Sequence, residues 1–292
     1  MALEAQGRKL EGLGLHLNLY ALAFFQRNVA GMKEQVDWAV GKPLAEDWLL
    51  SLESNTQAWS GHLTKARELS RQAVESALRA DEREPAASWE ANAALREALF
   101  GNAVAARQSA AAATLAARSR DAEAQAALAY AFASDLAHAQ ALADDLNNRF
   151  AQDTVVRMVW LPTIRAQIEA DRKHPAKSIE FLEATTPYEL GMLRASASDS
   201  CLYPVYVRAQ AYLSDQQSLA AAEFQKILDH RGLLWNCATG ALAHLGLARA
   251  YALQGETAKA RAAYQDFLTL WKNADPDIPI LKQATAEYAK LQ

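Results

Sequence analysis

The stretch ALAHLGLARAYALQGETAKARAAYQDFLTLWK, residues 241–272, contains two apolar periodic segments separated by Gly255. The residues that recur at helical spacing are Leu247, Ala248 and Tyr251 in the first segment and Ala260, Tyr264 and Phe267 in the second. Small residues at Ala248 and Ala260 allow two helices to approach to backbone contact, and larger residues fill the spaces between neighbouring hairpins. A glycine between two such segments is typical of a turn. The stretch therefore predicts a helical hairpin.

The same residues resemble the tetratricopeptide signature, W-x2-L-G-x2-Y followed by A-x3-F and P. The chain departs from that pattern at three positions, with His244 in the tryptophan place, Ala248 in the glycine place and Lys272 in the proline place. The resemblance implies a solenoid in which stacked hairpins contact mainly their neighbours.

The phase of this hairpin recurs along the chain when its turn residue is used as a marker. The markers are Arg27, Gly61, Gly101, Ser134, Lys173, about Gln216, and Gly255. Seven positions before the markers lie Ser54, Ala94, Ala127, Ala166, Ala209 and Ala248, with Tyr20 as the exception in the first unit. Five positions after them lie Ala66, Ala106, Ala139, Ser178, Ala221 and Ala260, with Met32 as the exception. In the sixth unit, a turn one residue shorter would place Ala220 on the packing face instead.

We therefore expect an all-α, right-handed solenoid of about seven tetratricopeptide-like hairpins, with helix over roughly three quarters of the residues. It would span residues 1–292 as one domain, and Pro279 would begin a C-terminal capping helix. Residues 185–200 interrupt the repeat and are interpreted as a loop joining sub-arrays 1–184 and 201–292. The alternative is an ordinary Ala-rich helical bundle, which would not place small residues on both sides of successive turns.

Composition limits the class of partner. The chain of 292 residues is 51% hydrophobic, carries a net charge of −4 and contains no block of clustered Lys and Arg. Nucleic acid is therefore not expected as the partner, because neutralising phosphates requires clustered basic side chains. The most hydrophobic early window, residues 13–25, is 13 residues long and contains His16 and Asn18. Because a membrane span needs about 20 apolar residues, we expect a soluble chain.

The two cysteines, Cys201 and Cys237, are too few for a disulfide scaffold and lack the spacing of a metal site. We expect two free thiols, and we favour a cytoplasmic over an extracytoplasmic location. A bond between the two cysteines would contradict the first expectation and favour an extracytoplasmic setting.

Several further segments carry a second resemblance. They are EDWLLSLES, KARELSRQAVESALRA, ALADDLNNRF, AEFQKILDHRG and GALAHLGLARAYALQGETAKARAAYQDFLTLWKNADPDIPILKQ. Together they resemble the C-terminal repeat region of bacterial eukaryotic-like serine/threonine protein kinases, which are common in acidobacteria; related repeats end some winged-helix regulators. The resemblance implies a sensory or scaffolding module of a larger signalling protein. It carries over no catalytic residue, because the chain has no Gly-rich phosphate loop, V-A-I-K strand, H-R-D or D-F-G motif.

Residues able to perform catalysis or bind a metal are scattered. The histidines are His16, His62, His138, His174, His230 and His244, and they fall in different repeats. Asp229, His230 and Cys237 include the residue types of an orienter, a base and a nucleophile. They lie, however, where one hairpin ends and the next begins, with no oxyanion loop in the sequence. We expect no enzyme activity, no metal and no cofactor.

The first helix of each hairpin lines the concave face of a tetratricopeptide array. By the register above, the residues that point there are Trp48, Asn55, Trp59, Leu95, Phe132, Trp160, Gln167, Tyr203, Tyr206, Gln210, Arg249 and Leu253. Aromatic and amide side chains on one concave surface suit a groove that binds a protein or peptide. The alternative is that these aromatics fill the interior of a tightly wound superhelix. A clamp for C-terminal carboxylates is disfavoured, because Ser51 stands where such a clamp needs a lysine, although Asn55 matches.

Two non-catalytic functions remain in view. The first is a protein-interaction module whose concave groove binds a peptide or a helical segment. The second is a regulatory domain that senses a small ligand and acts on an attached kinase or DNA-binding domain. An open apolar groove would favour the first, and an enclosed pocket with convergent polar groups would favour the second.

Overall fold

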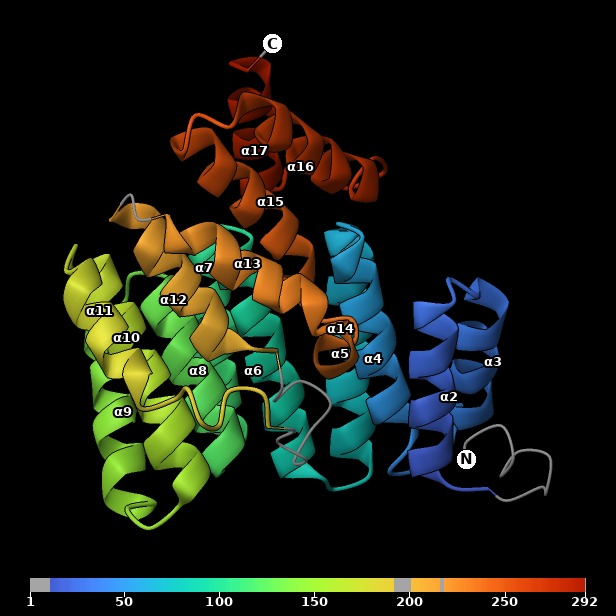
Figure 1. The fold of residues 1–292 in the computed structure, drawn as a ribbon. Coiled ribbons are helices and arrows are strands. Elements are labelled where there is room, and N and C mark those ends of the chain that lie inside the picture. Colours follow the sequence, from blue (N-terminus) through green and yellow to red (C-terminus); the bar gives the residue numbers. More distant parts are fainter. Residues whose placement is uncertain (1–10, 192–200, 216–217, 292) are drawn as a thin grey trace.

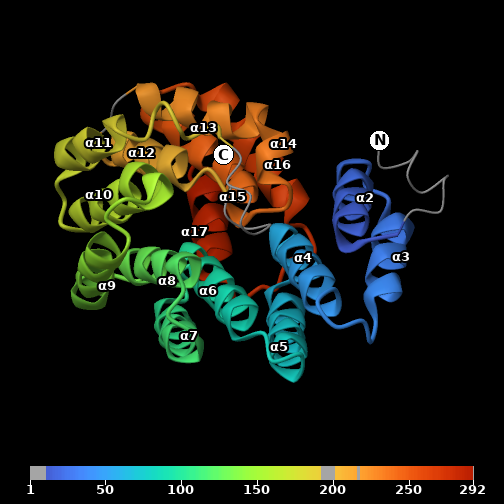
Figure 2. The same cartoon turned by 90° about the horizontal axis from the view of Figure 1, so that it is seen from below.

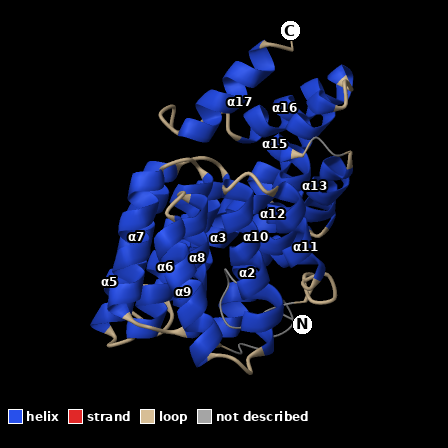
Figure 3. Cartoon of the chain, turned by 90° about the vertical axis from the view of Figure 1, so that its left-hand side faces the viewer, coloured by secondary structure: helices blue, strands red, loops and turns tan. Residues whose placement is uncertain are grey.

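The computed structural model describes residues 11–191, 201–215 and 218–291. It is 77% helical, and the described residues contain no strand (Figure 3). The expectation of an all-α chain with helix over about three quarters of its residues is therefore confirmed. Among the helices that the structure describes, none combines the length and the apolar run that crossing a bilayer requires.

Most helices pack in pairs that follow one another along the chain (Figure 1). The pairs are α2 (Leu13–Phe25) with α3 (Val29–Ala39), α4 (Glu46–Trp59) with α5 (Leu63–Arg79), α6 (Arg83–Leu99) with α7 (Ala103–Ala116), α8 (Arg120–Phe132) with α9 (Leu136–Arg149), α10 (Leu161–Asp171) with α11 (Pro175–Glu183), α12 (Tyr203–Ser214) with α13 (Leu219–Asp229), and α15 (Ala238–Leu253) with α16 (Thr257–Leu270). A π-helical turn, η1 (Val156–Trp160), leads into α10, and the remaining helices are α14 (Arg231–Leu234) and α17 (Pro279–Ala289).

The turn inside each described pair has a left-handed residue at the position that the sequence register predicts. The φ angles are 56° at Arg27, 78° at Gly61, 90° at Gly101, 58° at Ser134, 67° at Lys173 and 74° at Gly255. A left-handed residue after the last helical turn ends a helix by redirecting the chain and satisfying its last carbonyls. The marker expected near Gln216 lies outside the described residues.

The small residues around these turns are buried. Ala94, Ala127 and Ala166 before the turns have no exposed surface, and Ala66, Ala106 and Ala139 after them have none either. In the sixth unit Ala220 is 1% exposed, whereas Ala221 is only partly buried. Ala220 is therefore the small residue on the packing face, as expected for a turn that is one residue shorter.

Seen from below, the helix pairs follow an arc with α4, α6 and α8 on its inner side and α5, α7 and α9 on its outer side (Figure 2). The α15 helix contacts α4 and α6 as well as its sequence neighbours. Late and early parts of the chain therefore meet inside the arc.

The segment after α16 forms backbone hydrogen bonds with the turns of the second and third helix pairs. The backbone N–H of Asp275 donates to the carbonyl of Gly61 at 3.0 Å, and the N–H of Ile280 donates to that of Phe100 at 3.2 Å. A Cβ placed on Gly61 would lie 2.4 Å from the Cβ of Ala274, so this contact requires glycine. Pro279 begins α17 as expected.

The described part of the predicted loop, residues 185–191, is anchored to the helices beside it. Glu189 is 5% exposed, and its carboxylate accepts from both ends of the Arg208 guanidinium at 2.8 and 3.1 Å and from Lys226. Arg208 also donates to Glu223. Residues 192–200 of that loop lie outside the described residues.

Candidate functional site

Three aromatics expected on an open concave face belong to the interior. Trp160, Tyr203 and Tyr206 are 1%, 5% and 6% exposed. The ring centroids of Trp160 and Tyr203 are 6.1 Å apart, and those of Tyr206 and Phe224 are also 6.1 Å apart, in an edge-to-face arrangement. Burial puts these side chains out of reach of a partner, because the arc is wound tightly enough for them to fill the space between its helices. The same holds for Asn55, which is 7% exposed.

The other expected groove residues are dispersed. Trp48 packs edge-to-face on Trp89 with centroids 5.0 Å apart. Gln210 donates to the hydroxyl of Tyr206 at 3.1 Å. Gln167 is half-buried, Arg249 makes a two-pronged ion pair with Glu287 at 2.8 and 3.0 Å, and Leu253 is 55% exposed. Leu95 is 1% exposed, and Phe132 packs on Tyr206. The structure thus gathers no single recognition surface from these residues.

Trp59, by contrast, lines an open cavity. This cavity has a volume of about 640 Å³ and lies between α2, α3 and α4 on one side and α13 to α16 on the other. We call it the terminal groove. Its apolar lining includes Phe24, Met32, Trp59, Leu228, Leu234 and Leu270. Its walls therefore come from opposite ends of the chain, which the repeat register alone does not bring together.

The indole of Trp59 is held from two sides. Its ring lies edge-to-face on Phe24, with centroids 5.6 Å apart and planes at 90°. On the other side, a Cβ added to Gly240 would lie 2.3 Å from the indole, so the ring rests on the α15 backbone. The Trp59 carbonyl accepts the indole N–H of Trp271 at 2.9 Å, which fixes the end of α4. A half-buried aromatic held in this way offers a preorganised apolar contact.

The rim of the terminal groove is mainly cationic. Arg27, Arg231 and Lys272 are exposed, and none of the three makes an ion pair with any described carboxylate. Asp266 is the acidic residue of the lining. Burial lowers the pKa of His244, Asp266 opposes that change, and Arg231 adds to it. At neutral pH the histidine is therefore uncharged, and the cations outnumber the anions.

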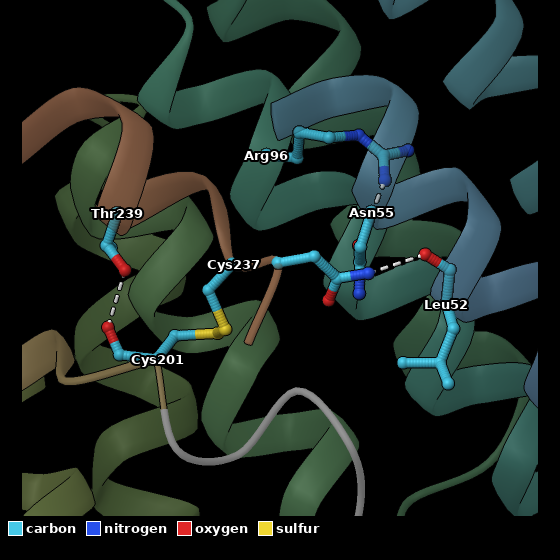
Figure 4. The surroundings of a disulfide bond; sticks show 7 residues. Leu52, Asn55, Arg96, Cys201, Cys237 and Thr239 are labelled. Atoms are coloured by element: carbon cyan, nitrogen blue, oxygen red, sulfur yellow. Dashed lines mark hydrogen bonds between the residues drawn. A yellow bond between two sulfur atoms is a disulfide. The ribbon is translucent and has the colours of Figure 1, made fainter. Parts of the chain in front are cut away.

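The cysteines form a disulfide, so the prediction of two free thiols is wrong (Figure 4). Cys201 and Cys237 are 36 positions apart, with Cα atoms 5.5 Å apart, and are 2% and 3% exposed. The bond joins Cys201, which directly precedes the N-cap residue of α12, to Cys237, which is the N-cap residue of α15. Beside it, the Thr239 hydroxyl donates to the Cys201 carbonyl at 2.6 Å. Periodicity gave no sign of this proximity, which arises from the folding of α15 into the arc.

A buried arginine that the sequence did not single out lies beside the disulfide (Figure 4). Arg96 is 3% exposed and donates to the hydroxyls of Ser54 and Ser70 at 3.0 and 2.8 Å and to Asn55 at 3.4 Å. Burial lowers the pKa of Arg96 to about 10. The adjoining cavity, which Asn55, Arg96 and Tyr203 help to line, measures about 10 Å³. That volume suits at most one water molecule, so this polar interior is not a ligand site.

The structure does not arrange Asp229, His230 and Cys237 as a catalytic set. The Nδ1 of His230 lies 2.7 Å from the carbonyl oxygen of Lys226, and Cys237 is bonded to Cys201. Within the described residues no cluster of three or more His, Cys, Asp or Glu side chains has the geometry to hold a metal ion.

A scan against protein-family models finds no match to this chain, and a search of curated proteins finds no match either.

Proposed function

We propose that this chain is a non-catalytic, tetratricopeptide-like solenoid of about seven hairpins that holds a segment of a partner protein in the terminal groove. The observation that carries the proposal is the terminal groove itself: an open cavity in which Trp59 is held in place and whose rim has cations that pair with no described carboxylate. Interfaces draw most of their binding energy from a few aromatic and Arg side chains, and tryptophan is prominent among them. The left-handed turns at the predicted register support the repeat assignment.

The resemblance to kinase-associated repeats supports a place in a larger signalling protein, as its regulatory part. The disulfide changes the expected compartment. Because such bonds persist mainly in oxidising environments, an extracytoplasmic location is favoured over the cytoplasmic one expected from composition.

A second candidate function is the sensing of a small effector. The volume of the terminal groove, about 640 Å³, lies within the range of about 300–1,000 Å³ that small-molecule sites occupy. The exposed rim at Arg27, Arg231 and Lys272 favours a longer ligand that extends out of the cavity.

A display library of random dodecapeptides, panned against the purified chain, tests the proposal. Enriched peptides should bind the Trp59→Ala variant at least tenfold more weakly, as expected for a hot-spot aromatic, while far-ultraviolet circular dichroism stays unchanged. The matched control is Trp38→Ala, because Trp38 is a half-buried tryptophan that stacks on His16 away from the groove. Failure to enrich any peptide, or equal binding to the Trp59→Ala variant, would refute the proposal.

A further inference from the structure

The cations of the terminal groove stand on both of its walls. Arg27 follows α2 on one wall, whereas Arg231 begins α14 and Lys272 follows α16 on the other. The apolar lining of the same cavity includes Trp59 from α4 and Leu234 from α14. Both walls of the cavity therefore carry a cation, and both also carry an apolar side chain.

Many of the other described basic side chains have acidic partners, although exposed ones such as Arg157, Lys282 and Lys290 form no ion pair with a described carboxylate. Arg67 is paired with Glu97, and Arg118 with Glu123. Against that background, the groove cations carry charge that no described carboxylate neutralises, in a chain whose net charge is −4. A ligand with carboxylates could neutralise them, and a concave, partly apolar surface strengthens such attraction relative to a flat exposed one.

We infer that the terminal groove selects an acidic peptide segment in which Asp or Glu residues flank a central apolar anchor. This inference rests on the proposed function and adds the chemistry of the partner to it. The apolar anchor contacts Trp59 and Leu234, and the flanking carboxylates meet Arg27 on one wall and Arg231 with Lys272 on the other. Asp266 is the one described lining residue that opposes such a ligand.

The panning experiment provides the probes. The enriched dodecapeptides should contain more Asp and Glu than Lys and Arg, on both sides of an apolar residue. A fluorescein-labelled copy of the most enriched peptide is then titrated by anisotropy at low and high salt. Its affinity should fall with salt and should fall about tenfold or more in the double variant Arg231→Glu/Lys272→Glu. Arg157→Glu, an exposed charge reversal on η1 away from the groove, should leave affinity unchanged.

A gain of affinity separates charge complementarity from damage to the fold. Asp266→Asn removes the opposing carboxylate, so the same peptide should bind it about twofold to fivefold more tightly, as for an exposed charge interaction. Enriched peptides that are neutral or basic, or an affinity unaffected by these substitutions, would overturn the inference while the proposed function stands. If no peptide is enriched, the proposed function fails, and this inference fails with it.

Discussion

Trp59 and Tyr206 are both aromatic residues of first helices, yet their surroundings differ. Trp59 is half-buried and faces the terminal groove, whereas Tyr206 is 6% exposed and packs on Phe132 and Phe224. The difference follows from what lies opposite each residue across the arc. Gly240 leaves room for the Trp59 ring, and the Tyr206 ring is enclosed by side chains. The two residues therefore have different expected consequences when truncated.

Tyr206→Ala should lower the free energy of unfolding by about 3–5 kcal/mol, because it leaves a cavity in the core. Trp59→Ala should lower it by only about 1–2 kcal/mol, because part of its ring is already in contact with solvent. Urea denaturation followed by circular dichroism measures both values. Equal destabilisation by the two substitutions would contradict the separation of core and groove.

The helix pairs depend on turn residues and small residues that sequence alone could identify. The markers at Arg27, Ser134 and Lys173 adopt left-handed φ without being glycine, so the phase of the repeat located them better than residue type would have done. The register also predicts which residues lie on first helices. It could not predict which of them remain accessible, because that depends on how α15 and the segment after α16 pack against α4 and α6. The position of α15 determines both one wall of the terminal groove and the proximity of the two cysteines.

Gly61→Ala should destabilise the chain more than Gly255→Ala. Both glycines have positive φ, 78° and 74°, so each substitution carries a backbone cost of about 1–2 kcal/mol. Only at Gly61 does the new Cβ also collide, with Ala274 at 2.4 Å, whereas nothing lies within 4 Å of the Cβ position at Gly255. The urea midpoints of the two variants give the comparison. Identical midpoints would mean that the contact between the second turn and the late segment contributes nothing.

Stability should decrease in acid partly through Glu169 at the end of α10. Its buried carboxylate lies 2.9 Å from His174, 2.8 Å from Arg172 and 3.3 Å from Lys177. Burial by itself raises the pKa of Glu169, but the hydrogen bonds to these three side chains have the larger combined effect in the opposite direction. The pKa of Glu169 therefore falls from 4.5 to about 2. The pKa of Glu169 is thus lower in the folded protein than in the unfolded chain, so the ionised carboxylate stabilises the fold at pH values above about 4.5. This contribution disappears as the pH falls from about 4.5 towards 2.

The Glu169→Gln variant isolates this effect. Its free energy of unfolding should change less than that of the wild type across this acidic range, as measured by urea titrations at successive pH values. Glu183→Gln, an exposed position on α11, serves as the control and should retain the wild-type slope. A wild-type slope in Glu169→Gln would contradict the assigned role.

At the scale of the whole molecule, the described structure is an arc whose ends are tied together. The α15 helix contacts α4 and α6, Asn236 donates to the carbonyl of Leu52 at 2.7 Å, and the disulfide joins the starts of α12 and α15. These contacts link residues far apart in sequence. Closure of the arc therefore holds the two walls of the terminal groove in place.

The disulfide should contribute about 2–4 kcal/mol to stability, because it restricts the unfolded chain. Urea denaturation with and without a thiol reductant measures this contribution. The Cys201→Ser/Cys237→Ser variant should match the reduced protein and should not respond to the reductant. A wild-type midpoint that does not change on reduction, or free thiols found by alkylation and mass spectrometry of the non-reduced protein, would contradict the bond.

Hydrogen exchange with mass spectrometry, on the chain with and without an enriched peptide, tests the terminal groove most directly. The account predicts that bound peptide slows amide exchange at both walls together, around residues 24–32 and 56–60 on one side and 228–244 and 266–272 on the other. Amides of α8 and α9, which do not line the groove, should exchange at an unchanged rate. Protection confined to α8 and α9, or to one wall alone, would contradict the claim that the two ends of the chain form one binding site.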